Sequence, residues 1–114
     1  MKYIKQYENK LDIKNFKNGD YVICEEKTNM ADINLVNFIN SNIGQILNSK
    51  ELDDSWDTLY EVRYENIPDE LKMTDHFHVK YTYYIRNFYQ KEIVHFSEKR
   101  ETLELILSAN KYNL

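Results

Sequence analysis

The chain has few of the residues that build tight turns, cross-links and ligand-binding loops: its 114 residues include two glycines, one proline and one cysteine. The single cysteine, Cys24, excludes an internal disulfide bond and a metal site made of several thiolates. Two glycines are too few for a phosphate-binding loop, and the sequence contains no nucleophile elbow, zinc-protease motif, P-loop or dinucleotide-binding fingerprint. These absences predict a protein that is not an enzyme and that uses no cofactor.

Long apolar runs are missing as well. No stretch reaches the roughly 20 apolar residues that a transmembrane helix needs, and the first residues lack the apolar region of a signal peptide. Together with the single cysteine, this pattern predicts a cytoplasmic protein, in a host cell or within an assembled particle, with no membrane contact. Cys24 lies in a predicted strand, where a small buried residue is expected rather than a nucleophile.

Aromatic and charged residues are abundant. The chain has ten Tyr, five Phe and one Trp, and it is rich in Lys, Asn and Ile, which, like Tyr, have AT-rich codons. This general character resembles that of short accessory proteins of phages and large viruses. The net charge of −4 comes from one region, because residues 51–75 carry nine carboxylates against Arg63 and Lys72 and sum to −7. Such a segment attracts a basic partner over a long range.

The length corresponds to one domain. Residues 1–18 have only a weak helical spacing, which predicts an N-terminal arm or a short helix, so that the folded domain spans 19–114. The remaining apolar patterns predict strands over 21–25, 43–48, 60–65, 80–89 and 92–96, and helices over 30–40, 69–75 and 97–110. Asn29 or Asp32 would cap the first of these helices, and Ser97 the last.

Strand 60–65 has the clearest alternation. Its inward residues would be Tyr60, Val62 and Tyr64, and its outward residues Glu61, Arg63 and Glu65. The opposite register would bury three charges, which costs several kcal/mol for each unpaired charge. The two longer helices would each bury an apolar stripe. The first stripe consists of Met30, Ile33, Val36 and Ile39, widened by Leu35 and Phe38, and the last of Leu103, Ile106 and Leu107.

Each glycine belongs to an apolar alternating run, and Gly19 and Gly44 both predict corners of a strongly curved sheet. Three segments resemble the first three strands of KOW, Tudor and related SH3-like modules: Gly19-Asp20-Tyr21-Val22, Ile43-Gly44-Gln45-Ile46 and Tyr60-Glu61-Val62-Arg63-Tyr64. The resemblance implies a mainly β (α+β) fold, an SH3-like five-stranded antiparallel barrel with a short inserted helix and a C-terminal helix. Such barrels bind peptides, methylated side chains or nucleic acid, so the resemblance selects no ligand.

The predicted partner-binding surface lies in the acidic segment and consists of Asp53, Asp54, Trp56, Asp57, Glu61 and Glu65. Trp56 stands between polar residues in a predicted loop. An exposed aromatic residue beside carboxylates suits a basic or proline-rich peptide, or an alkylated cation. The alternative is that Trp56 folds back and closes the end of the barrel. The pattern therefore predicts an interaction module that binds a protein partner with a basic surface.

Two other functions stay open. Carboxylates can stand in place of DNA phosphates, as in small phage or viral inhibitors that compete with nucleic acid for an enzyme. Direct binding of nucleic acid by the aromatic sheet face is less favoured, because phosphate binding would depend on the N-terminal lysines and a few other basic residues: Lys80, Arg86, Lys91, Lys99 and Arg100.

One spacing suggests a metal site. His76 and His78 would share one face of a strand, and His95 or Glu92 would complete the ligand set. Two surface histidines at the junction of a loop and a strand are the simpler interpretation. We therefore predict no metal ligands.

Overall fold

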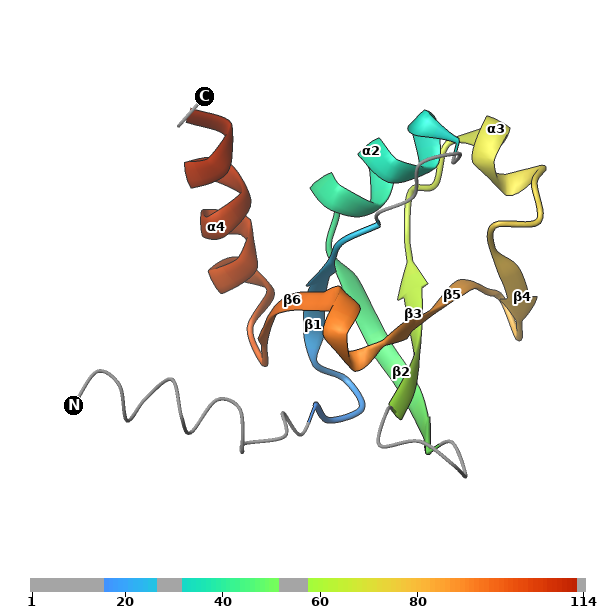
Figure 1. Ribbon diagram of the computed structural model, residues 1–114, viewed down its shortest axis with the longest axis horizontal. Coiled ribbons are helices and arrows are strands. Elements are labelled where there is room, and N and C mark those ends of the chain that lie inside the picture. The colour runs from blue at the N-terminus through green and yellow to red at the C-terminus, as the bar shows by residue number, and fades with distance from the viewer. Residues whose placement is uncertain (1–15, 27–31, 52–57, 113–114) are drawn as a thin grey trace.

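The computed structural model describes residues 16–26, 32–51 and 58–112 (Figure 1). Its elements follow one another as β1 (Tyr21–Cys24), α2 (Ile33–Ser41), β2 (Gly44–Glu51), β3 (Thr58–Tyr64), α3 (Asp69–Lys72), β4 (His78–Lys80), β5 (Tyr83–Tyr89), the 3-10 turn η1 (Gln90–Glu92), β6 (Ile93–Ser97) and α4 (Arg100–Tyr112). The six strands form one antiparallel sheet in the order β4-β5-β3-β2-β1-β6. The protein is thus a small α+β domain, as predicted.

The predicted five-stranded barrel is wrong, because the sheet has six strands and is not closed. Within the described residues, β4 and β6 each pair with a single strand and lie at opposite edges. The predicted strand 80–89 is in fact two strands, since Lys80 pairs with Tyr83 across a two-residue turn. Tyr81 begins that turn with a φ of 61°. Glycine or asparagine usually occupies such a position, so the sequence carried no signal for the break.

One face of the sheet, here called the core face, is covered by α2 and α3 (Figure 1). The predicted inward residues Tyr60, Val62 and Tyr64 are all buried on it. Aromatic rings pack edge to face across this layer, in the pairs Phe16–Tyr60, Phe38–Tyr64, Tyr64–Phe77 and Tyr64–Phe88. Such pairs each contribute about 0.5–1.5 kcal/mol beyond the area that they bury.

The predicted helix over 30–40 is confirmed as α2, with one change. Asp32 caps it, because its carboxylate accepts a hydrogen bond of 2.9 Å from the backbone N–H of Asn34. The inner stripe consists of Leu35, Phe38 and Ile39, whereas Ile33 is exposed. Met30 lies outside the described residues.

The opposite face is covered only in part. Helix α4 packs Leu103 against Ile23 and Ile43, with Ile106 and Leu107 at the margin, as predicted. The helix continues past Asn110 to Tyr112, two residues beyond its predicted end. This packing covers the β1 side of the sheet (Figure 1). In the part of the chain that the structure describes, no helix covers the same face of β2, β3, β4 and β5, which we call the open face.

The two glycines serve different purposes. Gly19 has a φ of 97° in the turn before β1, a conformation that side chains disfavour. Gly44 was predicted to bend β2, but the irregular pairing lies between Ile46 and Asn48 instead. A Cβ at Gly44 would collide with Val62 and would lie 2.9 Å from Cζ of Tyr64. Gly44 therefore lets β2 approach the core side chains of β3.

Candidate functional site

The open face is lined by the outward side chains of four strands. Cross-strand pairing places them in rows, since directly paired residues point to the same side. The rows are Lys50, Leu59 and Tyr89; Asn48, Glu61 and Asn87; Gln45, Arg63, Ile85 and His78; and Tyr83 with Lys80. Polar and aromatic side chains thus dominate a surface that no helix shields in the described residues.

Arg63 is held in place from three sides. Its Nε donates a hydrogen bond of 3.0 Å to Oε1 of Gln45, and the Gln45 side-chain amide donates in turn to the carbonyl of Gly19 at 3.0 Å. Its guanidinium carbon lies 4.7 Å from the ring centre of Tyr83, and Nη1 lies 3.4 Å from Oε2 of Glu65. The turn at Gly19 therefore fixes Gln45, and Gln45 fixes the guanidinium.

A second polar pair spans three strands. Lys80 Nζ lies 3.1 Å from Oε1 of Glu61, although β5 separates their strands. Glu61 pairs with Asn87 and Lys80 with Tyr83, so the ion pair passes over the residue midway between them, Ile85. Ile85 is fully buried. The lysine stem and its partner thus cover an apolar side chain that would otherwise meet water.

Three hollows adjoin one another around this centre. They have volumes of about 330, 320 and 250 Å³. Arg63 and Glu65 line the first two, and Tyr83 lines the second and third. The charged side chains around them are Arg63, Lys72, Lys80 and Arg100 against Glu61 and Glu65, a net charge of +2. The lining of the three hollows is therefore locally basic on a chain whose net charge is −4.

The predicted partner-binding residues fall into two groups. Asp53, Asp54, Trp56 and Asp57 lie outside the described residues. Glu61 and Glu65 lie on the open side of β3 and at its end, with 15% and 60% of their side chains exposed. Both are paired with cations, so neither is an isolated acidic contact.

Sequence reasoning missed Gln45 and Tyr83 as members of this site, and it named Arg100 only as a basic residue for nucleic-acid binding. The alternation of β3 placed Arg63 outward, and that was correct. Nothing in a single strand indicates which side chains of its neighbours meet it, because that depends on the register between strands.

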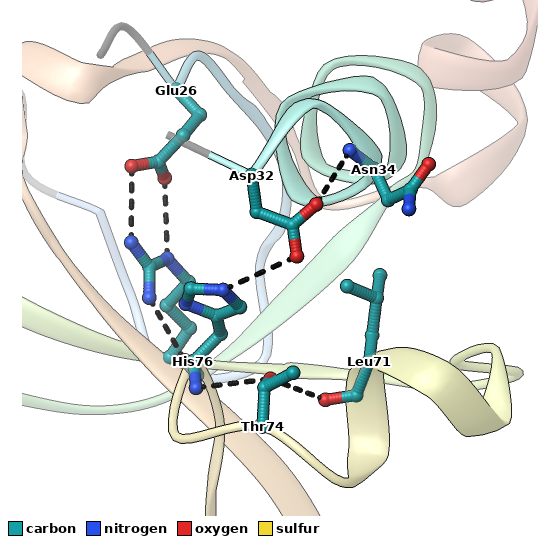
Figure 2. A network of polar contacts seen from close by, with 7 residues as sticks. Glu26, Asp32, Asn34, Leu71, Thr74 and His76 are labelled. Carbon is teal, nitrogen blue, oxygen red and sulfur yellow. Dashed lines mark hydrogen bonds and ion pairs between the residues drawn. The ribbon is translucent and has the colours of Figure 1, made fainter. Parts of the chain in front are cut away.

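The histidines weighed as metal ligands, His76, His78 and His95, lie in different parts of the fold. His76 Nε2 lies 3.5 Å from Oδ2 of Asp32, the residue that caps α2 (Figure 2). His78 is in β4, whereas His95 is in β6 at the other edge of the sheet. Within residues 16–26, 32–51 and 58–112, no three His, Cys, Asp or Glu side chains gather as metal ligands. His76 instead connects the loop after α3 to the start of α2.

A buried ion pair adjoins His76. Glu26 receives two hydrogen bonds from Arg86, at 3.2 and 3.0 Å, and Nη1 of Arg86 donates to the carbonyl of His76 at 2.8 Å. The backbone N–H of Glu26 also donates to Oδ1 of Asn40 at 2.9 Å. In Figure 2, Glu26 and His76 lie on opposite sides of the guanidinium group that bonds to both. These bonds satisfy a charge that would be costly if unpaired, and they fasten α2 to β5.

Cys24 is buried, as predicted. Burial raises the pKa of its thiol from 9.0 to about 12, beside the hydroxyl of Tyr64. Burial also raises the pKa of Tyr64, and among the described residues its hydroxyl has no hydrogen-bond partner of standard geometry. A thiol that stays protonated is a poor nucleophile. Cys24 is therefore a packing residue.

Comparisons with protein-family models, with curated proteins and with solved structures return no match. The geometry of the chain itself is therefore the basis for assigning a function. No helix among the described residues has the length and apolar character needed to cross a bilayer.

Proposed function

We propose that the protein is a non-enzymatic interaction module that binds a protein partner through the far end of the β2–β3 hairpin. One observation carries this proposal: the hairpin loses burial toward that end and points away from α2 and α3 (Figure 1). Ile46 is buried, whereas residues 48–50 are exposed. Glu51 pairs with Thr58 at the end, and residues 52–57 between them contain three aspartates and the single tryptophan.

Charge supports a basic partner. Residues 51–57 carry four carboxylates and no Lys or Arg, which sum to −4, and a concentrated field of one sign speeds the encounter with a surface of the other sign. Glu61 and Glu65 are neutralised by Lys80 and Arg63. The attraction is therefore assigned to Asp53, Asp54 and Asp57, which follow the exposed strand ends in sequence.

We also propose that the domain is an opened relative of the SH3-like barrels. β1 pairs with β2 and β2 with β3, the consecutive order that the three resembling segments imply. The inserted α2 and the short β4 are departures. An experimental structure tests this relation, which is wrong if β1, β2 and β3 do not superpose on an SH3-like barrel.

The experiment is a charge reversal at the hairpin end. A partner is first isolated by affinity purification from the native host, and its dissociation constant is then measured over a range of salt concentrations. Replacing Asp53, Asp54 and Asp57 together by Lys should weaken binding roughly tenfold at low salt and flatten the salt dependence. Asp69→Lys, Glu70→Lys and Asp75→Lys together reverse the same number of exposed charges in and after α3, and this control should leave affinity nearly unchanged. Unchanged binding in the triple variant contradicts the proposal.

The concentration of carboxylates also favours a second candidate, a small acidic phage or viral protein that mimics nucleic acid. In that case the purified partner would be a nucleic-acid enzyme. An oligonucleotide would compete with this protein for it at a near-stoichiometric ratio. Absence of competition for such an enzyme removes the second candidate and leaves the first intact.

A further inference from the structure

One hollow at the edge of the open face is lined by two arginines from different elements. It has a volume of about 330 Å³ and lies between β1, β2, β3 and the start of α4. Arg63 comes from β3, and Arg100 is the first residue of α4. The rest of its lining is Tyr21, Ile43, Gly44, Gln45 and Glu65. Two guanidinium groups on one concave surface make an attractive environment for an anion.

Within the described residues, both guanidinium groups have more N–H donors than hydrogen-bond and ion-pair partners. Arg63 uses Nε for Gln45 and Nη1 for Glu65, and Arg100 uses Nε for Glu104 at 3.2 Å. A guanidinium has five N–H donors, so each group has more donors than these contacts use. The chain from Gly19 through Gln45 fixes Arg63 before a ligand arrives, which lowers the entropy cost of binding.

The carboxylates that pair with these two arginines are exposed. Side-chain exposure is 60% for Glu65 and 55% for Glu104. Exposed ion pairs contribute only about 0–1 kcal/mol, so a ligand carboxylate can replace them at small cost. The Lys80–Glu61 pair differs, because Glu61 is largely buried and the pair covers Ile85. The replaceable contacts are therefore concentrated at the Arg63–Arg100 end.

We propose that this hollow binds a carboxylate group of a partner protein, either an acidic side chain or a chain terminus. A planar carboxylate matches the fork of N–H donors on a guanidinium. Glu65 lines the same hollow and would repel a phosphate dianion more strongly than a carboxylate. A nucleic-acid backbone needs a track of several free cations, whereas Lys80 is committed to Glu61.

The proposed carboxylate site is separate from the aspartates at the end of the β2–β3 hairpin, and its charge is positive where theirs is negative. Gln45 and Glu51 lie six residues apart on β2, which is about 20 Å at the rise of a strand. The two sites together would select a partner that presents a basic surface and, about 20 Å away, a carboxylate. This combined selection rests on the proposed function, whereas the carboxylate site itself does not.

The test uses the full chain and two small probes. N-acetylglycine carries a carboxylate, and N-acetylglycinamide is its neutral counterpart. Each is titrated while the Nε–H signals of Arg63 and Arg100 and the side-chain amide of Gln45 are followed by NMR. The acid should shift these signals saturably, and the amide should leave them unchanged. Arg63→Gln with Arg100→Gln should weaken binding of the acid at least about tenfold.

Lys50→Gln with Lys91→Gln removes the same charge from exposed positions outside the hollow and should leave the affinity unchanged. Arg100→Gln alone, at the start of a helix, tests the site without disturbing β3. It should also weaken binding, and the amide spectrum verifies folding in each variant.

The outcomes that contradict the proposal are distinct. If both double variants lose the same affinity for N-acetylglycine, the site is wrong, because the effect would then come from net charge alone. Tighter binding of inorganic phosphate or of an oligonucleotide overturns the choice of a carboxylate. These outcomes do not depend on the hairpin experiment, so the carboxylate site can stand even if reversing the three aspartates leaves partner binding unchanged.

Discussion

The two faces of the sheet are sealed by different means. On the core face, α2 and α3 bring apolar and aromatic side chains onto Val62 and its neighbours. On the open face, Ile85 is just as inaccessible, but its neighbours on that side are polar, and the Glu61–Lys80 ion pair passes over its position on β5. A buried apolar residue thus does not need a helix above it, because the methylene stem of a lysine can shield it while the charge stays near water. The comparison predicts a rigid, helix-covered face and an adaptable, polar one.

The largest effect is expected from a charge on the core face. Val62→Asp buries an unpaired carboxylate at a fully inaccessible position, which costs several kcal/mol. The variant should show no cooperative thermal transition by circular dichroism. Arg63→Ala, one residue away on the open face, should lose about 1 kcal/mol or less. A folded Val62→Asp variant would contradict the assignment of the two faces.

The close approach of β2 to the core face gives the next effect. Gly44→Ala should lower the free energy of unfolding by about 1–3 kcal/mol, because the new methyl group overlaps Val62. Urea denaturation measures the loss, and combining it with Val62→Ala should relieve part of it. Gly19→Ala is the matched control. Its cost of about 1–2 kcal/mol comes from a φ of 97° with no atom near the added group, so it should be additive with Val62→Ala.

The buried thiol predicts a dependence on alkaline pH. The pKa of Cys24 is about 12 in the folded chain against 9.0 in the reference state, so the folded chain retains its proton more strongly. Stability is therefore intact below pH 9 and falls as pH rises toward 12, by at most about 1.4 kcal/mol per pH unit. Urea unfolding at pH 8, 9 and 10 measures the slope. Cys24→Ala should show a shallower slope, and an identical slope would contradict the burial of the thiol.

The smallest effect is expected on the open face. Lys80→Ala and Glu61→Ala should each destabilise the chain by about 1 kcal/mol or less, with a coupling energy of roughly 0.5 kcal/mol in a double-mutant cycle. Lys80→Met keeps most of the stem and should restore stability if covering Ile85 is the main role. If Lys80→Met is as unstable as Lys80→Ala, the stability comes from the charge of Lys80 and not from its methylene stem over Ile85.

The elements that could be predicted are those with a complete local pattern. β3 alternates apolar and charged residues, α2 has its cap at Asp32, and α4 has a stripe that includes Leu103. Each pattern depends on neighbours within one turn or one strand, so a short window of sequence contains the whole signal.

The elements that were missed depend on contacts between distant segments. The turn at Tyr81 requires a positive φ without a glycine, and only the pairing of β4 with β5 selects it. The open sheet follows from β4 and β6 standing at opposite edges, which no local pattern reveals. The same holds for the candidate site, since Arg63, Gln45 and Tyr83 belong to three strands and meet only through their register.

The place of β1 in the sheet has a consequence for synthesis on the ribosome. β1 lies between β2 and β6, and Tyr21 pairs with Ser97, so one edge of β1 stays unpaired until residues 93–97 have been synthesised. At roughly 5–20 residues per second, translation takes several seconds to cover that interval. Ile23 waits equally long for Leu103 of α4. Folding of this domain is thus completed only after β6 and α4 have left the exit tunnel, and until then one edge of β1 is unpaired and accessible to a chaperone.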